Sequence, residues 1–146
     1  MRTKEFLQKL DHDRIVQAIQ EAEGKTSGNI RVYLQRGEFA GNALPLAQKQ
    51  FLKLKMDQTQ HRNAVLVFVA PRAQKFAVVG DSGIHQKCGD GLWNRVVQKM
   101  GEHFRQEHFT DALVDAIHDL GQVLAEQFPR VAGEKANELP DDVIEG

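Results

Sequence analysis

The chain has 146 residues, of which 41% are hydrophobic and 27% are charged, a composition typical of one globular domain with its own core. Its formal net charge of −1 excludes general electrostatic attraction as a basis for binding nucleic acid or an anionic membrane. Cys88 is the one cysteine, which excludes an intramolecular disulfide and favours a reducing compartment.

The N-terminal segment 1–14 is charged and lacks the apolar run of a signal peptide. No window approaches the roughly 18 consecutive apolar residues of a membrane span. We therefore expect a cytoplasmic protein that does not insert into a membrane. Apolar residues at helical spacing then predict a first helix over 13–23, which ends at Gly24.

Three strands are predicted after this helix. Alternating apolar and polar residues indicate a half-buried strand over 29–34. Asn42 is expected to cap a helix that runs to Met56. The unbroken apolar run within 63–70 is typical of a strand buried on both faces, and a short loop joins it to a strand over 75–79. The last two strands should form an antiparallel hairpin.

Two amphipathic helices complete the predicted fold. The first begins near Gly91, and the second begins at His108 or Thr110 and ends at Phe128. Their apolar stripes are Leu92, Trp93, Val96, Val97, Met100 and Phe104, and then Leu113, Ala116, Ile117, Leu120, Leu124 and Phe128. We expect a three-layer α/β/α sandwich over residues 1–130, with a small mixed sheet and helices on both faces. Residues 131–146 form a polar tail with acidic residues at Glu138, Asp141 and Asp142, expected to be loosely docked or disordered.

Topology predicts which polar residues meet. A right-handed crossover makes strand 29–34 parallel to strand 63–70, and the hairpin reverses strand 75–79. The starts of the first two strands and the end of the third therefore share one rim of the sheet. This rim gathers Ser27, Gly28, Asn29, Arg62, Asn63, Asp81 and Ser82, and Asp90 can fold back over it.

The chemistry of this rim has several interpretations. Asp81 and Asp90, with nearby amides, could bind a hard cation through oxygen. Arg62 could instead hold a phosphate or carboxylate in a bidentate manner. Structural roles stay open too: each aspartate can cap a turn or a helix, and Arg62 can be an ion-pair partner of Asp81. His85 and Cys88 lack the further ligands of a zinc site, and the glycine spacing fits no nucleotide loop.

Six segments resemble the TPM domain family, also described as the thylakoid acid-phosphatase-like domain. They are 26–32 (Thr-Ser-Gly-Asn-Ile-Arg-Val), 59–66 (Thr-Gln-His-Arg-Asn-Ala-Val-Leu), 79–84 (Val-Gly-Asp-Ser-Gly-Ile), 87–93 (Lys-Cys-Gly-Asp-Gly-Leu-Trp), 128–129 (Phe-Pro) and 137–140 (Asn-Glu-Leu-Pro). The resemblance implies an α/β sandwich and a divalent-metal site, usually proposed for calcium, at the acidic rim. Asp81 and Asp90 would be the metal ligands, with Asn29, Arg62, Asn63 and Ser82 around them.

The chain departs from the family pattern in three ways. Asn29 stands where the family often carries Glu, which should weaken a metal site or change its ion preference. Ala64 replaces a common Gly. Many relatives carry a signal peptide and a membrane anchor, whereas we expect neither here.

Three functions follow from this resemblance. The first is a calcium- or magnesium-binding module that acts through another protein, such as a membrane-anchored relative. The second is an acid phosphatase in which a metal or Arg62 neutralises the phosphate and Asp81 is the catalytic residue that positions water or acts as base. The third is a purely structural interaction domain with a vestigial site.

Overall fold

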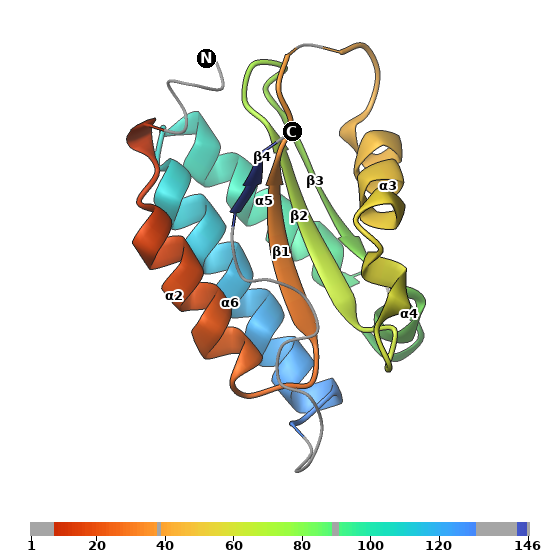
Figure 1. Cartoon of the computed structure of the whole chain (residues 1–146). Helices are drawn as coiled ribbons and strands as arrows, with labels where there is room; N and C mark the ends of the chain where they lie inside the picture. Colours follow the sequence, from red (N-terminus) through yellow and green to blue (C-terminus); the bar gives the residue numbers. More distant parts are fainter. Residues whose placement is uncertain (1–7, 38, 89–90, 131–142, 146) are drawn as a thin grey trace.

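The computed structural model describes residues 8–37, 39–88, 91–130 and 143–145, which build a sheet between two helical layers (Figure 1). The sheet has the strand order β3-β2-β1-β4. Its strands are β1 (Asn29–Leu34), β2 (Ala64–Ala70), β3 (Lys75–Gly80) and β4 (Val143–Glu145). β1 is parallel to β2 and β4, and β3 is antiparallel to β2, so the crossover and the hairpin are both confirmed.

Helices cover both faces of this sheet, which confirms the predicted α/β sandwich (Figure 1). One face carries α2 (His12–Glu23), α5 (Gly91–Arg105) and α6 (Phe109–Gln127), and the other carries α3 (Ala43–Lys53). Two short elements, η1 (Met56–Gln58) and α4 (Ser82–Cys88), lie on either side of the β2–β3 hairpin in the sequence. Within the described ranges, no helix is both long and apolar enough to cross a membrane.

Strand β2 explains why the protein has two cores. Successive side chains of a strand point to opposite faces of the sheet. Val65, Val67 and Val69 therefore pack with α2, α5 and α6, whereas Leu66 and Phe68 pack with α3. Every β2 residue is at most 2% exposed, as expected for a strand buried on both faces.

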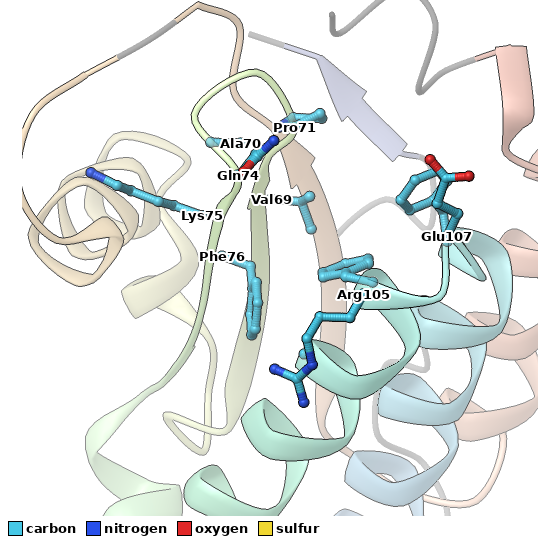
Figure 2. Close-up of a pocket in the computed structure, with 11 residues that line it drawn as sticks. Val69, Ala70, Pro71, Gln74, Lys75, Phe76, Arg105 and Glu107 are labelled. Atoms are coloured by element: carbon cyan, nitrogen blue, oxygen red, sulfur yellow. The ribbon is translucent and has the colours of Figure 1, made fainter. Parts of the chain in front are cut away.

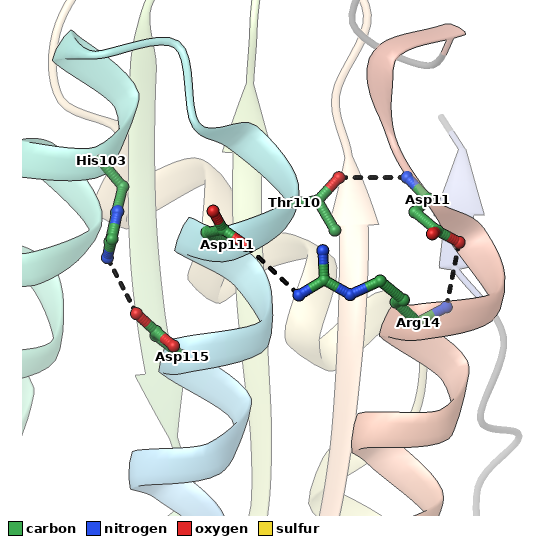
Figure 3. Close-up of polar contacts among 6 residues, drawn as sticks. All are labelled: Asp11, Arg14, His103, Thr110, Asp111 and Asp115. Atoms are coloured by element: carbon green, nitrogen blue, oxygen red, sulfur yellow. Dashed lines mark hydrogen bonds and ion pairs between the residues drawn. The ribbon is translucent and has the colours of Figure 1, made fainter.

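Polar contacts join the helices of the larger layer near their ends (Figure 3). The Asp11 carboxylate caps α2 by accepting from the Arg14 backbone N–H at 3.2 Å, and the Asp11 N–H donates to Thr110 Oγ1 at 3.1 Å. Arg14 pairs with Asp111 at 3.2 Å, and His103 with Asp115 at 2.8 Å. These contacts are half-exposed, so they orient the helices more than they stabilise them.

Two predictions about helices were wrong. The helix expected to reach Met56 ends at Lys53, because Lys55 adopts a left-handed conformation with φ of 59° that starts η1 instead. The sequence also predicted no helix between strand 75–79 and the helix expected near Gly91, whereas residues 82–88 form α4. α4 packs so closely against the backbone before β2 at Gly83 that a larger side chain would not fit there.

The predicted loose tail was also wrong for residues 143–145. These residues form β4, which pairs with β1 through Val32–Val143, Tyr33–Ile144 and Leu34–Glu145. Val143 packs against the larger core and Ile144 against the smaller one. Pairing covers an edge of β1 that would otherwise expose unpaired N–H and C=O groups. Glu138, Asp141 and Asp142 lie outside the described residues.

Candidate functional site

Three residues form a row across the sheet at the rim that topology predicted. Asn29 of β1 is the register partner of Ala64 in β2. Asp81 continues the β2–β3 ladder, because its N–H donates to the Ala64 carbonyl at 3.0 Å, one step beyond the Val65–Gly80 pair. Residues opposite each other in a ladder point to the same face of the sheet. The Asn29 amide and the Asp81 carboxylate therefore flank the small Ala64 side chain on the α3 face.

The Asp81 carboxylate is buried, at 5% exposure, and is fully engaged. Arg62 Nε donates to Oδ2 at 2.7 Å and Arg62 Nη2 donates to Oδ1 at 2.9 Å, a bidentate pair. The backbone N–H of Ser82 also donates to Oδ1 at 2.7 Å. The hydrogen bond and the negative charge of Asp81 raise the pKa of Arg62 above its already high usual value. Asp81 is thus the ion-pair partner of Arg62, and its carboxylate also accepts a backbone N–H at the start of α4.

The backbone around Arg62 is held close to α4. Arg62 itself has a positive φ of 51°, and its carbonyl accepts from the Gly83 N–H at 3.0 Å. A Cβ at Gly83 would lie 2.6 Å from the carbonyl oxygens of both His61 and Arg62. Glycine at position 83 therefore allows the close approach that places the Arg62 guanidinium on Asp81.

Asn29 is the unusual member of the row. It is fully buried, and neither of its amide atoms has a hydrogen-bond partner among the described residues. Buried amides almost always have such partners, because an unmade hydrogen bond costs about 1–3 kcal/mol. The Asn29 carbonyl oxygen is therefore a buried acceptor whose hydrogen-bonding capacity the described residues leave unused.

The other predicted site residues are placed differently. Asn63 is at the same end of the sheet, but alternation along β2 puts it on the face opposite Ala64, where its amide donates to Ser27 Oγ at 3.1 Å. Ser82 is exposed and contributes its backbone N–H to Asp81. Asp90 lies outside the described residues.

Two further buried polar residues at this end were not identified from the sequence. Glu23, at the end of α2, is 2% exposed, and its Oε2 accepts from the Ile30 N–H at 2.9 Å. Its position four residues after Ile19 on the apolar stripe could have revealed its burial. Thr59, just before β2, has a buried hydroxyl without a hydrogen-bond partner in the described structure, and no pattern in the sequence marks it.

The donor atoms suit a hard cation better than a soft one. The described residues hold no group of three or more His, Cys, Asp or Glu side chains that could bind a metal. Burial raises the pKa of the Cys88 thiol, so it is protonated at neutral pH and is a poor ligand or nucleophile. The available donor atoms are the oxygens of one carboxylate and one amide, and calcium prefers oxygen ligands. The carboxylate, that of Asp81, is already paired with Arg62.

Comparison with known proteins connects this chain to a family. The family model of the TPM domain matches residues 1–123. The chain is similar to the NMR structure of the BA42 protein from the psychrophilic bacterium Bizionia argentinensis, with 35% sequence identity and a TM-score of 0.84. That match covers 94% of this chain and 96% of the BA42 chain. No curated protein matches the chain.

Proposed function

This chain belongs to the TPM domain family, and we propose that it is a non-catalytic module that binds a divalent cation, with calcium preferred. The observation that carries the proposal is the row Asn29–Ala64–Asp81, in which a buried carboxylate and a buried, unpaired amide flank one small side chain. Asp81 would be the charged ligand and Asn29 Oδ1 a neutral one. Ser82 directly follows Asp81, whereas Asn63 lies on the opposite face of the sheet, and Asp90 remains a predicted further ligand.

The number of carboxylates sets the expected affinity. Calcium sites with few charged ligands bind in the range of about 10⁻⁴ to 10⁻³ M. Arg62 weakens binding further, because a cation must displace the guanidinium from Asp81 or share the carboxylate with it. Half of the Arg62 side chain is exposed, so it can move into solvent without opening the core. A site of this affinity is filled only when the calcium concentration approaches the millimolar range.

Calcium titration of the ¹⁵N-labelled chain tests this proposal. We expect saturable amide shifts at Asn29, Arg62 and Asp81, with smaller shifts for magnesium, which dehydrates reluctantly. Asp81→Asn should remove these shifts. Arg62→Gln should tighten calcium binding by about tenfold, because the competing cation is gone.

Two control variants separate this competition from a general change of charge. Arg14→Gln makes the same change in net charge far from the rim and should leave the calcium affinity as it is. Arg62→Lys keeps the charge but loses the bidentate geometry, so its affinity should fall between wild type and Arg62→Gln. An Arg62→Gln variant whose rim amides do not respond at about 10 mM calcium would contradict the proposal, since even weak sites fill at that concentration.

Phosphomonoester hydrolysis is the alternative that the family resemblance suggests. It needs Asp81 as a base or Arg62 as a phosphate ligand, and in this structure each group is engaged by the other. We therefore expect the purified chain to hydrolyse p-nitrophenyl phosphate no faster than its Asp81→Ala variant, with or without calcium. A rate that depends on Asp81 would favour the phosphatase. The protein partner, for example a membrane-anchored relative, stays a prediction.

A further inference from the structure

A cavity lies at the opposite end of the sheet from the Asn29–Asp81 row (Figure 2). It has a volume of about 510 Å³ and lies between the β2–β3 hairpin and the turn that joins α5 to α6. Ligand pockets have volumes of roughly 300 to 1,000 Å³, so this cavity is large enough for a small organic molecule.

Aromatic rings line one side of this cavity, and polar groups make up nearly half of its lining. Val69 and Ala70 at the end of β2 are buried in its floor. Phe76 and Phe104 pack edge to face with their ring centres 5.1 Å apart, and the Phe104 and Phe109 rings are 6.1 Å apart. Such a surface favours the flat or branched apolar body of a ligand.

Among the described residues that line the cavity, Arg105 is the cation without a partner. Lys75 is committed elsewhere, because its ammonium donates to the Phe39 carbonyl at 3.3 Å and to the Gly41 carbonyl, and lies over the Phe39 ring. Arg105 has no hydrogen bond or ion pair with the described part of the chain. Its guanidinium lies near the Phe76 ring, because a Cβ built on Gly101 would be 3.6 Å from Arg105 Nη1 and 3.5 Å from Phe76. Figure 2 shows the Glu107 carboxylate pointing away from this guanidinium.

We propose that this cavity binds a small amphipathic carboxylate, with an aromatic body against Phe76, Phe104 and Phe109 and its carboxylate on Arg105. A guanidinium can bind a carboxylate through two parallel hydrogen bonds, which fixes the orientation of the ligand. Arg105 Nη1 and the Phe76 ring both lie next to Gly101, so one molecule can contact both.

Titration of the ¹⁵N-labelled chain with 3-phenylpropanoate tests this assignment. We expect saturable shifts at Ala70, Phe76 and Gly101. The neutral analogue 3-phenylpropanamide should bind the same residues about tenfold more weakly, because it lacks the charge that Arg105 recognises. Arg105→Gln should reduce the affinity for the carboxylate about tenfold and leave that for the amide unchanged.

Two control variants distinguish loss of the Arg105 contact from a general change of charge and from the cation site. Arg95→Gln removes the same charge from an exposed position of α5 outside the cavity and should change neither affinity. Asp81→Asn should bind 3-phenylpropanoate as the wild type does, so failure of the cation site and failure of this pocket are separable. The assignment is overturned if the cavity amides do not shift, or if Arg105→Gln lowers the affinities for carboxylate and amide equally.

Discussion

Replacing Gly83 by alanine is expected to lower the free energy of unfolding by about 3 kcal/mol, the upper end of the usual cost of overpacking. The new Cβ would lie 2.6 Å from two backbone carbonyl oxygens, those of His61 and Arg62, and backbone atoms cannot turn aside as a flexible side chain can. Either α4 or the segment before β2 must move. That movement also strains the hydrogen bond from the Gly83 N–H to the Arg62 carbonyl.

Urea unfolding monitored by circular dichroism measures this loss. Gly91→Ala is the matched control, because a Cβ at Gly91 meets no atom within 4 Å, so its effect should stay within about 0.5 kcal/mol. At temperatures where the Gly83→Ala variant is still folded, the backbone amide NMR signals of Arg62 and Asp81 should also shift from their wild-type positions. A variant as stable as the wild type would show that α4 is not held against the segment before β2.

The strands were predictable because their burial patterns are local. The alternation over 29–34 and the unbroken apolar run within 63–70 predicted the limits of β1 and β2 to within a residue. The expected half-burial of β1 was wrong, because Asn29 and Tyr33 on its second face are buried as well. Strand β4 was not predictable in this way. It has three residues, too few to show a period, and it exists because β1 offers an open edge.

The candidate site was only partly predictable, for a related reason. Topology alone brought Asn29, Arg62 and Asp81 to one rim, since parallel and antiparallel connections determine which strand ends meet. It could not say which face each side chain takes, because that depends on the register of individual residues. Asn63 and Ala64 are neighbours in sequence, and yet Ala64 lies in the row and Asn63 lies behind it.

The unpaired state of Asn29 likewise needed the structure. From the sequence, Asn in place of the family's usual Glu indicates a weaker metal site, because a charged ligand becomes a neutral one. The structure adds that this amide is fully buried without a hydrogen-bond partner in the described ranges, a cost that a purely structural residue at this position would avoid. This buried, unpaired amide is the observation that favours the proposed cation site over a purely structural role.

Replacing Gly121 by alanine is expected to lower the free energy of unfolding by about 2 kcal/mol, whereas Gly101→Ala should raise it by about 0.5 to 1 kcal/mol. Both glycines lie inside long helices, so alanine brings each the same gain in helix propensity of about 1 kcal/mol. At Gly121 the new Cβ would lie 2.6 Å from the Ala22 Cβ, because α2 packs closely against α6 there. At Gly101 the nearest atoms are 3.5 and 3.6 Å away, an ordinary contact.

The difference between these two variants isolates the helix contact. Because the propensity gain is common to both, it cancels, and the remaining difference of about 3 kcal/mol reports the clash between α6 and α2. For a domain of this size we expect the two melting temperatures to differ by about 10 °C, measured by differential scanning calorimetry. Equal melting temperatures would mean that α2 shifts away from α6 at little cost. In that case the apolar core beneath α2 and α6, and not the close contact at Gly121, would hold the two helices together.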